Sequence, residues 1–219
     1  MTKAKRRLEI GTEPWLEVTG GRLTAVQALG LATAGFGQTL RDMFIIRKPL
    51  SIEESKRQSE RVSIARKEVA KVLETHRERV LDRQGEAVMN HTARTYLFGA
   101  ALVSDEIFSR IDHTIASVAS TSSVKLARAA VISHFQPNLP SQSGAEAQMI
   151  ALGASADVMG IGLKKIDPEL LRDIWVEWPD LGFIQEVRVL LKGERTRAPR
   201  TRPGVLAISG MPYLLRSSK

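Results

Sequence analysis

The chain has no cysteine and few aromatic residues. Without cysteine there can be no disulfide, no thiolate metal site and no cysteine nucleophile. Aromatic residues make up 5% of the 219 positions, and two of them are tyrosines, so few rings are present on which nucleic-acid bases could stack. The fold needs no oxidising compartment. We expect a cytoplasmic protein, or one within a nucleoprotein assembly or virion.

Long hydrophobic runs are also missing. No uncharged apolar run reaches the roughly 18 residues that a membrane-spanning helix needs. The closest approach is the range 23–40, which contains two glutamines, three threonines and three glycines. We predict that this range is a buried helix packed closely through its small residues. The N-terminal basic residues have no apolar segment behind them, so we do not expect secretion through a signal peptide.

Recognisable catalytic and ligand-binding motifs are absent. The chain contains no HExxH, no Walker lysine motif, no GxGxxG after a strand and no GxSxG. The histidines lack metal-ligand spacing, and they stand at His76, His91, His113 and His134. The acidic group at Asp167, Glu169 and Asp173 is explained by its place at a helix start, where carboxylates stabilise the dipole. We therefore expect no metal, no cofactor and no enzymatic activity.

The hydrophobic pattern has a helical period along most of the chain. Two helix starts stand out: Ser51 with Glu54 forms a capping box, and Asp167 caps a helix that opens on Pro168. Gly85 is expected to separate two helices, the second of which lies centrally in the core. Helices are predicted over 23–44, 52–83, 86–117, 123–135, 145–160, 168–178 and 183–191, with 183–191 the weakest pattern. The side chains of 145–160 are mostly small, which suits the close approach of another backbone.

The remaining ranges lack this period. The range 11–21 is predicted to be an irregular arm, and 193–203, with two prolines, to be extended. The range 205–215 could be a short strand or a docking arm. The fold class is therefore all-α, a single helical domain of about six or seven helices with extended N- and C-terminal arms. We divide the chain into a flexible basic arm (1–22), a helical core (23–192, with a possible sub-boundary at 136–144) and a basic loop with a C-terminal arm (193–219).

Positive charge is concentrated near the carboxyl end. The chain has a formal net charge of +8 and a pI of about 10.0, whereas the range 84–186 is net acidic. Between 188 and 202 a single acid, Glu194, accompanies the basic residues Arg188, Lys192, Arg195, Arg197, Arg200 and Arg202. Guanidinium groups bind phosphate oxygens in pairs and stay charged at cellular pH. We predict that this cluster holds the phosphates of a nucleic acid on an extended loop.

Other residues complete this hypothesis. Basic residues of the long helix at 52–83 are predicted to line the other wall of a groove, namely Arg57, Arg61, Lys67 and Lys71. Three apolar or aromatic residues of the terminal arms are predicted to dock on neighbouring subunits, namely Trp15, Tyr213 and Leu214.

The sequence leaves three function classes open. The first is a structural protein that self-associates and coats a nucleic acid, expected to be single-stranded, as nucleocapsid and coat proteins do. Because few aromatic rings are available to stack on bases, we expect its contacts to be sequence-independent contacts to phosphates. The second is an oligomeric interaction or scaffold subunit without nucleic acid, in which the acidic middle of one copy meets the basic arm of another. The third is an enzyme of an unfamiliar type.

Overall fold

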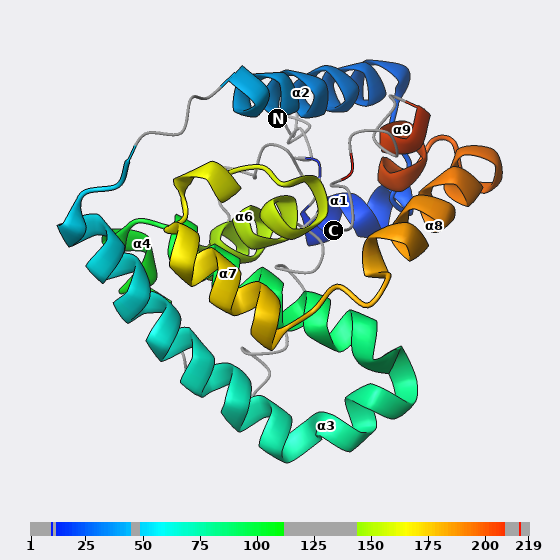
Figure 1. Cartoon of the computed structure of the whole chain (residues 1–219). Coiled ribbons are helices and arrows are strands. Elements are labelled where there is room, and N and C mark those ends of the chain that lie inside the picture. The colour runs from blue at the N-terminus through cyan, green and yellow to red at the C-terminus, as the bar shows by residue number, and fades with distance from the viewer. Residues whose placement is uncertain (1–9, 11, 45–48, 112–143, 209–214, 216–219) are drawn as a thin grey trace, which may run out of the picture.

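The protein is all-α in the computed structural model, which describes residues 10, 12–44, 49–111, 144–208 and 215. No β-strand occurs within those ranges. The helices are α1 (Glu13–Thr19), α2 (Ala25–Phe44), α3 (Ile52–Leu102), α4 (Asp105–Phe108), α6 (Ala145–Met159), α7 (Pro168–Glu177), α8 (Phe183–Arg197) and α9 (Arg202–Ile208), with a 3₁₀ turn at Leu163–Lys165. In Figure 1, α3 turns back on itself in a V whose second arm passes behind α7, and α6 lies above that arm. Helices α8 and α9 lie at the opposite side with α2 above them.

The V shape of α3 comes from Gly85, which has φ 76° and ψ 165° inside an otherwise helical run. A left-handed φ is accessible to glycine at little cost, and the predicted separation of two helices at this residue is confirmed. The predicted capping box is also confirmed, because the Ser51 side chain accepts a hydrogen bond from the Glu54 amide. We call 52–84 the first arm and 86–102 the second arm of α3.

The second arm packs tightly against α6 and forms the centre of the core. Leu97, Phe98 and Ala100 on α3 are fully buried, as predicted for a central helix. The helices touch through backbone: a Cβ on Gly153 would lie 1.7 Å from the Thr95 carbonyl oxygen. The small residues of α6 therefore permit the close approach that the sequence indicated.

A second hydrophobic cluster joins the two ends of the chain. Trp15 of α1 is 1% exposed and packs with residues of α2, α8 and α9. Leu206 of α9 is buried in the same cluster. Both terminal segments, as far as the structure describes them, thus contribute to the folded core.

Four predicted elements differ from the structure. The range 11–21 contains α1, because Thr12 caps the helix and Gly20 ends it with φ 60°. The predicted extended range 193–203 is helical up to Arg197 and again from Arg202. The range 205–215 begins within α9 rather than in a strand or arm. The helix predicted over 86–117 ends at Leu102, where Ser104 caps α4.

Two further predictions lie wholly or almost wholly outside the described residues: the helix at 123–135 and the loop at 136–144, of which residue 144 alone is described.

Candidate nucleic-acid interface

Three basic residues share the outward face of α8. Arg188, Lys192 and Arg195 follow one another at steps of four and three residues, the spacing of one helix face. The adjoining face is buried through Phe183, Ile184, Val187 and Leu191, and Arg188, next to it, is half-buried. We call the three basic residues the α8 basic stripe. Lys192 and Arg195 are exposed and form no ion pair with any other described residue.

The stripe exists because α8 continues through Gly193. A glycine inside a helix costs about 1 kcal/mol relative to alanine, which the buried face of α8 can offset. The helix ends at Arg197 because Pro199 disfavours a helical conformation at Ala198, whose φ is −141°. The basic residues that were predicted to lie on an extended loop therefore lie partly on a helix.

A second pair of cations lies where the connection between α1 and α2 meets the turn between α8 and α9. Arg22 and Thr201 form an antiparallel bridge, and the Leu23 amide donates to the Arg200 carbonyl oxygen at 2.7 Å. Arg22 and Arg200 are both exposed and have no ion-pair partner among the described residues. We call them the turn arginines. Arg22 was not predicted as a site residue, since nothing in the sequence indicates that it lies beside Arg200.

The other two arginines of the cluster have partners within the chain. The Arg197 guanidinium is bonded to Glu194, one turn before it on α8, with a distance of 2.9 Å from Nε. The Arg202 guanidinium lies 5.7 Å from the centre of the Trp15 ring, within reach of a cation–π contact. Burial lowers the pKa of Arg202 below its ordinary value. Arg188 of the stripe likewise donates to Gln185 on its own helix, so these three side chains are less available to an outside phosphate than Lys192 and Arg195.

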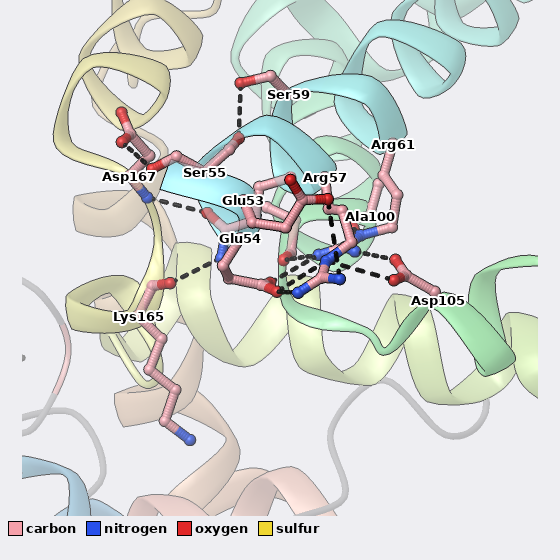
Figure 2. A network of polar contacts seen from close by, with 12 residues as sticks. Glu53, Glu54, Ser55, Arg57, Ser59, Arg61, Ala100, Asp105, Lys165 and Asp167 are labelled. Atoms are coloured by element: carbon pink, nitrogen blue, oxygen red, sulfur yellow. Dashed lines mark hydrogen bonds and ion pairs between the residues drawn. The ribbon is translucent and has the colours of Figure 1, made fainter. Parts of the chain in front are cut away.

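Arg61 on the first arm of α3 is 5% exposed and fully engaged. Its Nε donates to the Ala100 carbonyl oxygen at 2.9 Å, and its Nη2 donates to that of Ala101 at 3.1 Å. It also pairs with Asp105 and Glu54. Figure 2 shows its guanidinium directed into this network, so Arg61 is not accessible to a phosphate and its predicted place on a groove wall is corrected.

Arg57 belongs to the same network, with Glu54 at 3.2 Å and Asp105 at 3.6 Å. Lys67 and Lys71 are exposed on the first arm, one turn apart. In Figure 1 this arm and α8 lie at opposite sides, with α6 and α7 between them. The two basic regions therefore do not face one another as two walls of a single groove.

The three residues predicted to dock on neighbours have different outcomes. Trp15 is buried in the core of its own chain, because α1 folds back onto α8 and α9. Tyr213 and Leu214 lie outside the described residues.

The most buried polar cluster of the described residues was missed by sequence reasoning. Arg94 and Asp157 are both 0% exposed, and Arg94 Nε donates to Asp157 Oδ1 at 2.7 Å. His91 donates from Nδ1 to Asp157 Oδ2 at 2.6 Å and stacks on Phe183. Burial disfavours the ionised carboxyl, but the hydrogen bonds from His91 and Arg94 outweigh it and lower the pKa of Asp157.

This cluster holds three elements together. Arg94 Nη1 also donates to the carbonyl oxygens of Trp178 and Pro179, at 2.9 and 2.8 Å. These carbonyls follow the end of α7, where orphan acceptors need partners. The cluster thus joins α3, α6 and the α7–α8 connection. Arg94 and Asp157 are 63 positions apart in the sequence, so no local spacing could have indicated this cluster.

An acidic groove of about 1080 Å³ lies between the two arms of α3 and the end of α7. Its lining includes Glu74 and Glu78 from the first arm, Glu86 from the second and Glu177 from α7. Glu177 also pairs with Arg66 at 3.0 Å. Two of these glutamates, Glu86 and Glu177, belong to the net-acidic range 84–186, whereas Glu74 and Glu78 precede it.

Searches of protein-family models, of curated proteins and of solved structures found no match to this chain. None of the described helices combines the length and hydropathy needed to cross a bilayer. In the same ranges, no three His, Asp or Glu side chains are grouped closely enough to hold a metal ion.

Proposed function

We propose that this protein is a structural, non-catalytic nucleic-acid-binding protein that self-associates and coats its ligand through sequence-independent phosphate contacts. The observation that carries the proposal is the α8 basic stripe, three cations on one face of a rigid helix with the turn arginines beyond its end. Arg188 and Arg195 are separated by about 10 Å along the helix axis, roughly the rise of three nucleotides in one strand of a duplex.

The chemistry of these side chains favours backbone contacts over base reading. Guanidinium and ammonium groups neutralise phosphates, and the resulting counterion release makes binding depend on salt rather than on sequence. Val189 and Leu190 are the exposed large hydrophobic residues of α8, which therefore presents no exposed aromatic ring for stacking within its described length. The ligand class is therefore a polyanion with regularly spaced phosphates.

The test is the salt dependence of binding to a labelled single-stranded oligonucleotide and to a duplex. Five phosphate contacts predict a slope of log K against log salt of about −3.5 for a single strand. Replacing Arg188, Lys192 and Arg195 by alanine should lower the affinity roughly ten- to a hundredfold at low salt and bring the slope to about −1.4. Oligonucleotides of different sequence should be affected alike.

The matched control removes three lysines from the first arm of α3: Lys56, Lys67 and Lys71. All three are exposed, so the fold should tolerate alanine there. The net charge falls by the same amount, but the affinity should change far less. Equal losses in both triple variants would mean that binding follows net charge and is not localised on α8. Unchanged binding by the α8 variant would reject the interface altogether.

The second candidate is an oligomeric interaction subunit without nucleic acid. The acidic groove favours it, because a basic segment of a neighbouring copy would complement four glutamates. Size-exclusion chromatography after nuclease treatment separates the candidates. An assembly that persists without nucleic acid, and that is lost when Glu74 and Glu78 are changed to glutamine, would favour the interaction subunit.

A further inference from the structure

Helix α2 has two apolar faces, and the chain itself covers one of them. Leu31 is 8% exposed and packs into the second hydrophobic cluster, with Ala28 and Ala32 partly buried beside it. The opposite face carries five large hydrophobic side chains that the described part of the chain leaves in solvent. They are Val26 (77% exposed), Leu29 (66%), Phe36 (50%), Leu40 (37%) and Phe44 (79%). The sequence prediction that this segment is a buried helix is therefore correct for one face only.

We propose that this outward face, which we call the α2 stripe, binds the α2 stripe of a second copy of the chain in an antiparallel, two-fold symmetric helix pair. The proposal deepens the proposed function, since it rests on the self-association included there and names the surface responsible. A wide apolar face on a helix is normally buried against a partner, and in Figure 1 α2 lies along the edge of the molecule.

The pattern of large and small residues along the stripe is self-complementary. A two-fold axis level with residue 35 places Val26 opposite Phe44 of the second copy and Gly30 opposite its Leu40. Gly30 and Gly37 face open space, because a Cβ built on either would meet no atom within 4 Å. Each leucine at position 40 can therefore insert where the facing helix has no side chain, which lets the two backbones approach.

The polar group within the stripe is already satisfied. Thr33 Oγ1 donates to the Leu29 carbonyl oxygen at 2.9 Å. The hydroxyl therefore keeps a hydrogen-bond partner when an interface excludes water from it. The same axis places Thr33 opposite Gly37 of the second copy. None of the five stripe residues is charged, and the same axis brings the flanking Arg41 level with Leu29 of the second copy, at the edge of the contact.

The size of the stripe suits a second copy better than a membrane. Five such side chains expose apolar area on the order of 500 Å², so two copies would bury on the order of 1,000 Å², at the lower limit of specific interfaces. Helices that lie on membranes carry many basic residues on their polar face. Arg41 is the one basic residue of α2.

The experiment measures the mass of the nuclease-treated full-length chain by light scattering across a range of concentrations. We expect a dimer in equilibrium with monomer. Leu29→Glu with Leu40→Glu should yield a monomer with an unchanged helical spectrum. Val176→Glu, on the exposed face of α7 (77% exposed), is the matched control and should leave the dimer intact.

The orientation is tested by disulfide formation, which this cysteine-free chain makes unambiguous. Mixing Thr33→Cys with Gly37→Cys chains should give cross-linked dimers several-fold faster than either variant alone, because these positions face one another across the axis. Equal rates in the mixture and in the separate variants would reject the antiparallel pairing.

Other outcomes would overturn the proposal in favour of a different occupant. A monomeric parent chain whose melting temperature falls on Leu29→Glu would mean that another segment of the same chain covers the stripe. A monomer that floats with anionic phospholipid vesicles would mean that a membrane surface does. An α8 triple variant that binds oligonucleotide as well as the parent, in a chain that still forms the dimer, would reject the nucleic-acid interface and leave the α2 pairing standing. A monomeric parent chain whose oligonucleotide binding is lost in the α8 triple variant would reject the α2 pairing alone.

Discussion

At the scale of single residues, the structure separates charged side chains that look alike in the sequence. Arg57 and Arg61 stand one turn apart on α3, yet Arg61 is buried among carbonyl oxygens and carboxylates while Arg57 stays half-exposed. Arg94 and Asp157 form a fully buried ion pair that no local pattern indicated. Removing one partner of such a pair leaves the other charge uncompensated in the core.

Asp157→Asn should therefore lower the free energy of unfolding by about 3–5 kcal/mol at neutral pH. Urea-induced unfolding followed by circular dichroism measures this. Asp173→Asn is the control, because Asp173 pairs with Arg172 on the exposed face of α7, and it should change stability by at most about 1 kcal/mol. A small effect at Asp157 would mean that the buried network contributes little.

The lowered pKa of Asp157 also sets a pH dependence. A carboxyl whose pKa is lower in the folded than in the unfolded state contributes stability that is fully present above the unfolded value of about 3.9 and is lost as the pH falls through the folded value. The parent chain should thus lose stability in acid below about pH 4 more steeply than Asp157→Asn. If the free energy of unfolding fell in parallel with pH for the parent chain and Asp157→Asn, Asp157 would not be the origin of the acid dependence.

Tyr96 should titrate abnormally. Burial, together with the nearby carboxylates of Glu68 and Glu146, raises its pKa to about 12. An unfolded tyrosine ionises near 10, so the unfolded state releases its proton first and stability should fall as the pH rises from about 10 to 12. The chain has two tyrosines. In Tyr213→Phe, tyrosinate absorbance should appear only towards pH 12, and ionisation near 10 in the folded protein would contradict the burial of Tyr96.

At the scale of elements, helix starts were predicted well and helix continuation was not. Ser51 and Asp167 each satisfy backbone amides in the first turn, a local interaction that neighbouring residues determine. Gly193 was expected to end a helix, but α8 passes through it because Leu191 and Val187 are buried against other elements. Whether a glycine breaks a helix depends on the tertiary packing that surrounds it.

Two glycines provide a matched test of this point. Gly153→Ala should destabilise the protein by about 3 kcal/mol or more, because the new Cβ would lie 1.7 Å from the Thr95 carbonyl oxygen and would force α6 away from α3. Gly193→Ala meets no atom within 4 Å and should instead stabilise α8 by about 0.5–1 kcal/mol. Thermal and urea unfolding measure both changes. Equal effects at the two sites would show that α3 and α6 are not in close contact.

At the scale of the whole molecule, two hydrophobic clusters share the same helices. The second arm of α3 supplies Leu97 and Phe98 to one cluster and Val88 to the other, and α6 likewise supplies Ala156 and Val158 to different clusters. Clusters linked in this way should unfold together.

The tryptophans make this cooperativity measurable. Trp15 belongs to one cluster, whereas Trp175 and Trp178 pack against the other. In Trp15→Phe, the remaining fluorescence of Trp175 and Trp178 reports the cluster that contains Leu97 and Phe98. In the double variant Trp175→Phe with Trp178→Phe, the fluorescence of Trp15 reports the second hydrophobic cluster. For each variant the fluorescence and circular dichroism transitions in urea should coincide. Transitions that separate would reveal two independently unfolding units.

The sequence alone determined the all-α class, the caps at Ser51 and Asp167, the bend at Gly85 and the small-residue packing of α6, because each of these follows from backbone preference and helical period within a few residues. The tertiary structure alone decided that Arg61 is buried and Lys192 exposed, that Asp157 meets Arg94, and that α2 keeps an apolar face in solvent. These outcomes depend on which surfaces distant segments cover, and helical period indicates that a residue belongs to a face without indicating what lies opposite it.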